Sequence, residues 1–118
     1  MAKRAKPRSD EHHHPHREAP KLSDAAFVRA AALFRAAGDP ARLRLMHVLA
    51  HDEWCVTELA TSTGTKLSTL SQQLRVLYSE RIVERRRDGK HIYYRLADEH
   101  VRELVSAALE HAGEPPAR

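Results

Sequence analysis

Two histidines near the C-terminus each lie close to a carboxylate, and these residue types together can bind a transition metal. His100 follows Asp98 by two positions, and Glu114 follows His111 by three. Eleven positions separate the two histidines. On one helix this separation is roughly 16 Å, whereas a zinc ion holds its ligands at about 2 Å. The two histidines of one chain therefore cannot share a metal ion.

The same spacing allows the histidines to meet across a dimer axis. Because eleven residues make almost three whole helical turns, His100 and His111 lie on the same side of a helix. If two copies of that helix pack antiparallel, two symmetry-related sites form, each with ligands Asp98, His100, His111 and Glu114. Two imidazoles and two carboxylates suit Zn(II), or Co(II) or Ni(II) with additional ligands, and disfavour Cu(I) and As(III). The alternative is that these side chains are exposed and bind no metal.

The composition is that of one small domain with a separate N-terminal tail. With 118 residues, of which 42% are hydrophobic, the chain is long enough for a single core. Residues 1–22 contain three prolines, four histidines and almost no large apolar side chains, so we expect a disordered basic tail. The folded domain then covers residues 23–113, and residues 114–118 form a short C-terminal end.

Two absences in the sequence limit where the protein works and what it binds. No apolar stretch approaches the length needed to cross a bilayer, and the charged N-terminus lacks the apolar segment of a secretory signal. We therefore expect a cytoplasmic protein with no membrane partner. The single cysteine, Cys55, excludes an intramolecular disulfide and a metal site made of several thiolates.

Two helices are predicted at the start of the folded domain. The first begins at Ser23 or Asp24, either of which can cap it, and ends at Gly38. The second follows directly, with Asp39 as N-cap and Pro40 at the first helical position. His47 and His51 on this second helix are expected to face solvent.

The next segment has the pattern of a helix-turn-helix followed by a hairpin. Thr57 can cap a short helix that ends before Gly64, and a second helix carries a stripe of leucines. The stripe consists of Leu67, Leu70, Leu74 and Leu77, and we expect it to face the core. Residues 81–96 then contain two β-rich runs on either side of Asp-Gly, which predicts a two-stranded hairpin. A last helix follows, with Asp98 at its cap, and ends at Gly113. This order predicts a mainly α fold with a β-hairpin wing, the winged helix-turn-helix.

Positively charged and small polar side chains are concentrated on the second helix of the predicted helix-turn-helix and on the hairpin. Between Lys66 and Arg95 there are eight Lys or Arg and three acids. The face opposite the leucine stripe carries Ser68, Thr69, Ser71, Gln72, Arg75 and, at its edge, Gln73. The hairpin adds Arg85, Arg86, Arg87, Lys90 and His91. Such side chains can contact bases and phosphates, so we predict that these residues bind DNA; the alternative is a solvated helix face.

Four segments resemble the ArsR/SmtB family of metal-responsive transcriptional repressors. They are LFRAAGDPARLRLMHVL, CVTELA, LSQQLRVL and RRDGKHIYYRL, and the resemblance covers about residues 27–112. It implies a homodimer that binds double-stranded operator DNA and leaves it when a metal binds. The pattern from Asp98 to Glu114 resembles the C-terminal-helix site of the family's zinc sensors, which implies Zn(II) as effector. Gln73 departs from the family, which usually has histidine there.

The resemblance also implies a second metal site that uses the cysteine. Cys55 and Glu58 occupy positions that supply ligands in some family members, where the partner's N-terminal tail completes the site. Here the tail offers His12, His13, His14 and His16. The alternative is that Cys55 is a small buried residue and the histidine run a solvated tail.

Two other classes of function are alternatives to a metal-responsive repressor. A winged-helix repressor that responds to a non-metal effector would use its last helix only for dimerisation. An enzyme is disfavoured, because the chain has no recognisable nucleophile pocket and lacks the size to enclose a substrate.

Overall fold

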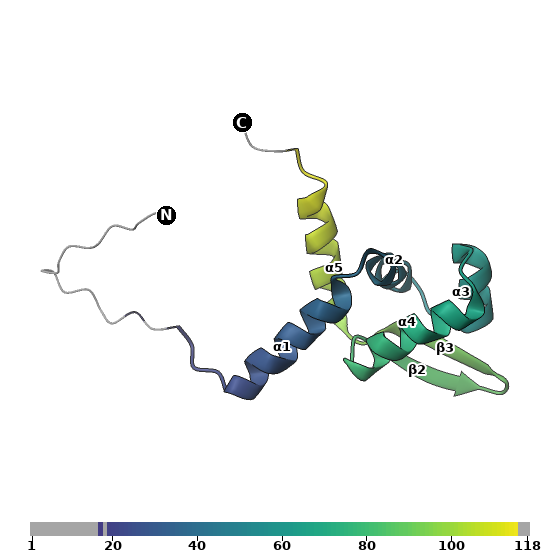
Figure 1. Cartoon of the computed structure of the whole chain (residues 1–118), viewed down its shortest axis with the longest axis horizontal. Helices are drawn as coiled ribbons and strands as arrows, with labels where there is room; N and C mark the ends of the chain where they lie inside the picture. The colour runs from purple at the N-terminus through teal and green to yellow at the C-terminus, as the bar shows by residue number, and fades with distance from the viewer. Residues whose placement is uncertain (1–16, 18, 116–118) are drawn as a thin grey trace, which may run out of the picture.

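The computed structural model describes residue 17 and residues 19–115. Most of the tail predicted over residues 1–22, including all four of its histidines, lies outside the described residues. The described elements are α1 (Asp24–Ala37), α2 (Pro40–Leu49), β1 (Trp54–Cys55), α3 (Val56–Thr63), α4 (Leu67–Ser79), β2 (Val83–Asp88), β3 (His91–Leu96) and α5 (Glu99–Ala112). This order is that of a mainly helical winged helix-turn-helix, and the predicted fold class is confirmed (Figure 1).

Three of the helices begin at polar caps that the sequence indicated. The side chains of Ser23, Asp39 and Asp98 accept hydrogen bonds from the third backbone N–H of α1, α2 and α5 respectively. The predicted cap of α3 was wrong. With Thr57 as N-cap the helix would begin at Glu58, but it begins at Val56. Its N-cap is Cys55, which still has extended backbone as the end of β1, and the Glu58 carboxylate accepts the Cys55 N–H at 3.4 Å.

The leucine stripe of α4 packs into a single core, with one exception. Leu70, Leu74 and Leu77 are at most 1% exposed, whereas Leu67 at the start of the helix is 49% exposed. The prediction of a four-leucine buried stripe was therefore wrong at Leu67, because the first turn of α4 extends beyond the core. The other large core residues come from α2, α3, the segment after α4, the sheet and α5: Leu45, Met46, Leu49, Leu59, Ile82, Val83, Tyr94, Leu96, Val101 and Val105.

The predicted two-stranded hairpin is confirmed as β2-β3, and the short strand β1 adds to it, which gives a three-stranded antiparallel sheet in the order β1-β3-β2. Strand β1 was missed because its two residues are too few to show any alternation of side chains. It pairs Trp54 with Tyr94 and Cys55 with Tyr93. The turn between β2 and β3 consists of Gly89 and Lys90, and Gly89 has the positive φ (63°) that favours glycine.

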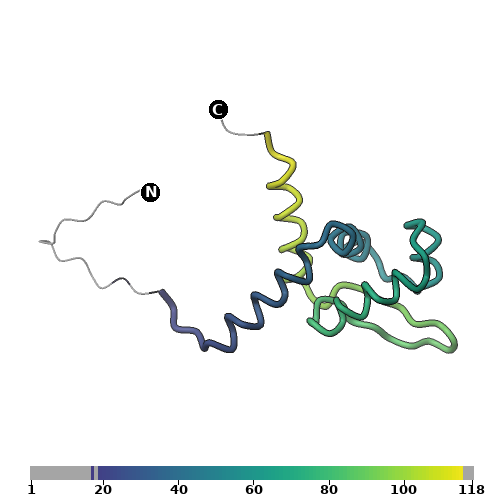
Figure 2. Tube along the Cα trace, viewed as in Figure 1, coloured from purple at the N-terminus to yellow at the C-terminus, as the bar shows by residue number. Residues whose placement is uncertain are grey.

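The domain has two ends, a reading end formed by α3, α4 and the β2-β3 hairpin, and a helical end formed by α1 and α5 (Figure 1). Figure 1 shows α3, α4 and the β2-β3 hairpin together on one side, with α1 and α5 on the other, and the trace in Figure 2 shows α5 running away from the hairpin. Arg102 of α5 donates to the Ala50 carbonyl oxygen at the end of α2 (3.0 Å), so α5 is tied to the body of the domain. No helix in the described part of the chain is long and apolar enough to cross a membrane.

Helix α1 leaves large apolar side chains uncovered. Phe27, Val28 and Phe34 are each 60% or more exposed, and Leu22 just before the helix is similarly exposed. Isolated apolar side chains are common on protein surfaces, but two phenylalanines and two aliphatic residues on one short segment indicate an interaction surface.

Candidate nucleic-acid interface and metal centre

The exposed face of α4 carries most of the predicted base-reading residues. Burial of Leu70, Leu74 and Leu77 fixes the rotation of the helix, so the opposite side faces solvent. The exposed residues are Ser68, Thr69, Ser71, Gln72 and Arg75. Gln73 lies elsewhere: it is half-buried and lines a cleft with Ala41 and Val48 of α2 and Thr65. The structure therefore does not bring Gln73 to this face.

The three consecutive wing arginines separate onto the two faces of the hairpin. The register pairs Arg85 with buried Tyr94 and Arg87 with half-buried Ile92, so both arginines share the face that covers the core. Arg86 pairs with Tyr93 on the outer face. Arg86 therefore projects from the opposite face of the hairpin to Arg85 and Arg87.

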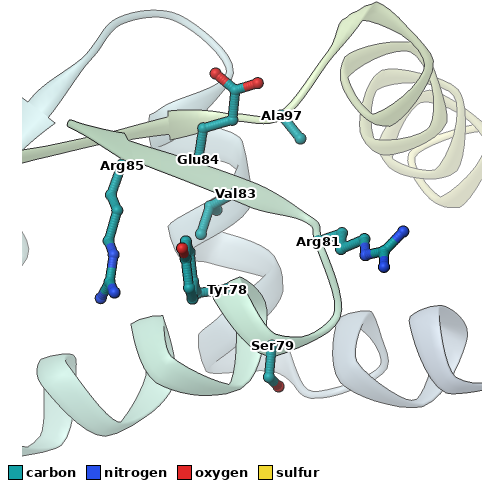
Figure 3. A pocket seen from close by; sticks show the side chains of 7 residues that line it. All are labelled: Tyr78, Ser79, Arg81, Val83, Glu84, Arg85 and Ala97. Carbon is teal, nitrogen blue, oxygen red and sulfur yellow. The ribbon is translucent and has the colours of Figure 1, made fainter.

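Arg85 is stacked on the recognition helix. Its guanidinium carbon lies 4.0 Å from the centre of the Tyr78 ring, within the range of a cation–π interaction. In Figure 3 the Arg85 side chain descends from β2 beside Tyr78, while Arg81 points away from both. Hydrogen bonding to the Tyr94 hydroxyl raises the pKa of Arg85. The stacking of Arg85 on Tyr78 fixes the position of the wing relative to α4.

Arg86 already has a protein carboxylate as its partner. Its Nε and Nη2 donate to the two carboxylate oxygens of Glu53, at 2.8 and 2.9 Å, and its guanidinium lies 4.7 Å from the centre of the Tyr93 ring. The hydrogen bonds from Arg86 lower the pKa of Glu53. Arg95 is similarly held, by Glu84 at 2.9 Å. Sequence reasoning missed Glu53, because 33 positions separate it from Arg86.

The Arg86–Glu53 pair should be visible in a carboxyl titration. We expect Glu53 to titrate below the usual range of glutamate in the wild type and within that range in the Arg86→Gln variant, as measured by carboxyl ¹³C NMR. The lowered pKa means that the pair stabilises the folded wing at neutral pH and that this contribution is lost as pH falls through the lowered pKa. An unchanged Glu53 titration in Arg86→Gln would show that the pair does not persist in solution, and Arg87→Gln, on the opposite face of the hairpin, is the matched control.

The remaining predicted wing residues lie at or near the hairpin tip. Arg87, Lys90 and His91 are all exposed. Among residues 19–115, neither Arg87 nor Lys90 makes an ion pair. These two cations are therefore available to phosphate groups in a way that Arg86 is not.

Helix α5 carries two pairs of metal-binding side chains, one at each end. His100 Nδ1 lies 3.9 Å from Asp98 Oδ1, and His111 Nδ1 lies 3.5 Å from Glu114 Oε1. Two ligands of a tetrahedral zinc ion are about 3.3 Å apart when each bond is about 2 Å long. The side chains of His100 and His111 are 94% and 86% exposed. Each pair is thus close to the required spacing and open to a partner.

Neither pair is a complete metal site within one chain. In the described residues no three His, Cys, Asp or Glu side chains cluster closely enough to hold an ion. The structure brings Asp98 to His100 and His111 to Glu114, and it keeps the two pairs at opposite ends of α5. On the same side of the helix Leu104 is half-buried and Ala107 exposed, whereas Val101 and Val105 face the core. The histidine side of α5 is therefore uncovered.

The predicted cysteine site is less prepared for a metal. Cys55 is 4% exposed, and its Sγ lies 3.3 Å from the Thr57 hydroxyl oxygen. Glu58 is exposed, but its carboxylate accepts the Cys55 backbone N–H. His12, His13, His14 and His16 lie outside the described residues.

An exposed polar recognition helix, a basic wing and a helical end with an uncovered face define a winged helix-turn-helix DNA-binding protein. Residues 39–85 match the family described as "Bacterial regulatory protein, arsR family". The chain is 46% identical over 84 residues to a transcriptional repressor SmtB homolog of Synechocystis, an alignment that covers 71% of this chain and 64% of the relative. It is 38% identical to a cadmium resistance transcriptional regulatory protein CadC homolog of Staphylococcus aureus, covering 71% and 70% of the two chains.

Solved structures agree with these relatives. A homodimeric winged helix-turn-helix DNA-binding domain from Mycobacterium bovis, described as a possible ArsR-family regulator, superimposes with a TM-score of 0.74 at 34% identity. The match covers 84% of this chain and 94% of that domain. The chain therefore belongs to the ArsR family, whose members are transcription regulators and not enzymes. It spans about two thirds of the length of the curated relatives it matches.

Proposed function

We propose that this protein is a metal-sensing transcriptional repressor that binds operator DNA as a homodimer and is released when Zn(II) binds, with Co(II) and Ni(II) as alternative effectors. The observation that carries the proposal is the pair of incomplete metal sites on the uncovered side of α5. Two half-sites on one helix become whole sites when a second copy packs antiparallel.

The uncovered apolar surface of α1 supports the dimer. Burial of Phe27, Val28 and Phe34 against a partner removes apolar area from water, which is the main source of association free energy. The M. bovis domain is described as homodimeric. In this arrangement α1 and α5 form the interface, and the α4 helices of the two chains read successive major grooves.

Dimerisation can be tested separately from metal binding. Sedimentation of the metal-free wild type should give about twice the chain mass of 13.4 kDa. Phe34→Glu should shift the protein towards monomer, because a carboxylate would be buried without a partner. Leu67→Glu is the matched control, since Leu67 is also exposed but lies at the reading end, and it should leave the mass unchanged. A wild-type monomer at micromolar concentration would contradict the proposal.

The ligand types favour zinc over softer metals. Each proposed site has two imidazoles and two carboxylates, a set that suits Zn(II), Co(II) and Ni(II). A relative named as a cadmium resistance transcriptional regulatory protein supports a metal effector for this chain. The one cysteine here is buried, which leaves the chain poor in the thiolates that Cd(II) prefers.

The direct test is release from DNA. An operator selected from random-sequence DNA with metal-free protein, and then labelled, should lose the protein when Zn(II) is added, as followed by fluorescence anisotropy. Co(II), Ni(II) and Cd(II) tested in parallel would rank the effectors. Retention of the complex with all four metals would favour a repressor with a non-metal effector.

A further inference from the structure

A second pair of histidines lies away from α5, at the C-terminal end of α2. His47 and His51 are four positions apart, and both are exposed. The backbone of Ala50 between them is still right-handed helical (φ −73°, ψ −21°), so both side chains project from the same side of the last turn. Their ring centres are 4.9 Å apart, with an angle of 83° between the ring planes.

The hydrogen bonding of His51 fixes which of its nitrogens is free. His51 Nδ1 lies 2.9 Å from the carbonyl oxygen of His47. A carbonyl oxygen only accepts hydrogen bonds, so Nδ1 carries the hydrogen and, in the neutral ring, Nε2 has the lone pair. Metal-binding histidines commonly donate their second ring N–H to a backbone carbonyl in this way, which orients the ring and increases the basicity of the ligating nitrogen.

The separation of the two rings matches that of two imidazoles on one metal ion. With a metal–nitrogen bond of about 2.1 Å, and a ring centre about 1.1 Å beyond the nitrogen, each centre lies about 3.2 Å from the metal. The two centres are then about 4.5 Å apart at a right angle between the bonds and about 5.2 Å apart at the tetrahedral angle. The observed 4.9 Å falls between these limits.

The electrostatic surroundings favour a cation. The C-terminal end of a helix carries partial negative charge from its last carbonyl groups, and α2 ends at Leu49. The exposed carboxylate of Asp52 directly follows His51. Arg44 opposes these contributions, because it lines the same hollow as His47.

We propose that His47 and His51 form an additional metal site, a two-imidazole chelate for a divalent ion that prefers nitrogen ligands: Zn(II), Ni(II) or Cu(II). Water completes the coordination. All protein ligands come from one chain, so this site fills without a partner, in contrast to the split sites on α5. A zinc-saturated protein then holds one more ion per chain than the α5 sites account for.

The test uses the full chain with every other candidate histidine cluster removed. The background variant carries alanine at His12, His13, His14, His16, His100 and His111. Of the nine histidines it retains His47, His51 and His91. Zn(II) is added under reducing conditions, with binding measured by calorimetry and the imidazole ¹⁵N resonances by NMR. We expect one ion per chain, with the Nε2 resonance of His51 and a ring-nitrogen resonance of His47 shifting together and those of His91 unchanged.

Single substitutions in this background separate a chelate from isolated histidines. His47→Ala and His51→Ala should each weaken zinc binding at least tenfold, because the second donor on the same helix acts at an effective concentration of about millimolar or higher. His47→Ala also leaves the backbone carbonyl that orients His51 in place, so a loss of binding in it cannot come from a misoriented His51 ring. His91→Ala should have no effect.

Two results would overturn the proposal. One is zinc affinity that is unchanged in both His47→Ala and His51→Ala. The other is binding that leaves the imidazole resonances of His47 and His51 unmoved. Since the background variant has no α5 histidines, neither result bears on the proposed release mechanism.

Discussion

Replacing His100 or His111 with alanine should abolish zinc-induced release from DNA while leaving metal-free operator binding nearly unchanged. The exposed side chains of these histidines contribute little to the fold, so their loss should not alter the reading surface. Zinc can shift the equilibrium only if it binds the DNA-free arrangement more tightly than the DNA-bound one. The usual range of such coupling is about 1–3 kcal/mol, a change of roughly 5- to 150-fold in operator affinity. Anisotropy with and without Zn(II) measures it.

In the proposed mechanism, zinc causes release by changing the spacing of the two α4 helices. Clamping the two ends of α5 to those of a partner helix fixes the angle between the protomers. Arg102 ties α5 to the end of α2, and the core joins α2 to α4, so the clamp sets the separation of the two α4 helices. Half-sites are about 34 Å apart, one turn of DNA, and a shift of a few ångströms would weaken both together.

Mixing the two single variants provides a sharper test than either alone. In a heterodimer, the His111→Ala chain still supplies His100 and the His100→Ala chain still supplies His111. One complete site is thus restored, and zinc-induced release should return in part. Release that persists in both single variants would place the sensor at Cys55 and the tail, whereas failure of the mixture would contradict sharing across the dimer.

The second large effect concerns the recognition helix and the wing. Gln72→Ala should change the sequence preference, at a cost of about 1–3 kcal/mol for the preferred base, because an amide reads adenine through two hydrogen bonds. Arg87→Ala should instead weaken binding to all sequences and reduce the slope of log affinity against log salt by about one, as expected for loss of a phosphate contact. Binding measured across a salt series on selected and scrambled DNA distinguishes the two.

Arg86→Ala is the matched control for Arg87→Ala. The two residues are neighbours with the same charge, but Arg86 is already paired with Glu53. We therefore expect a smaller change in salt slope for Arg86→Ala. An equal loss in both variants would show that DNA displaces Glu53, and unchanged binding in both would remove the wing from the interface.

Features that depend on residues close in sequence could be predicted, whereas features that depend on distant residues could not. The caps at Ser23, Asp39 and Asp98 and the order of elements were predicted, because they depend on residues within one or two turns. Strand β1 was not, since two residues extend only when β3 is present to pair with them. Leu70 is buried and Leu67 is exposed because the core ends between these two positions of α4, which the sequence pattern does not show.

The candidate sites show the same division. The two ligand pairs on α5 could be read from local spacing, and the structure places each pair within 4 Å. The different situations of Arg85, Arg86 and Arg87 could not be predicted, because they depend on strand register and on Glu53 and Tyr78, which lie in other elements. In the proposal, the α5 sites are completed by a second chain. The position of that second chain cannot be predicted from the sequence of one chain.

The capping role of Asp98 has an evolutionary consequence for the proposed metal site. Its Oδ1 accepts the Val101 N–H and starts α5, so the fold itself requires a capping side chain at this position whether or not a metal is sensed. Aspartate meets that requirement through the same Oδ1 that lies 3.9 Å from His100 Nδ1, so one oxygen both caps the helix and faces the histidine. A non-sensing ancestor with this cap would be one histidine away from half a metal site, and a descendant that abandons sensing could exchange Asp98 for asparagine or serine without losing the helix. Gain and loss of metal response in this lineage should therefore leave the fold untouched, and residue 98 should vary among capping residues alone.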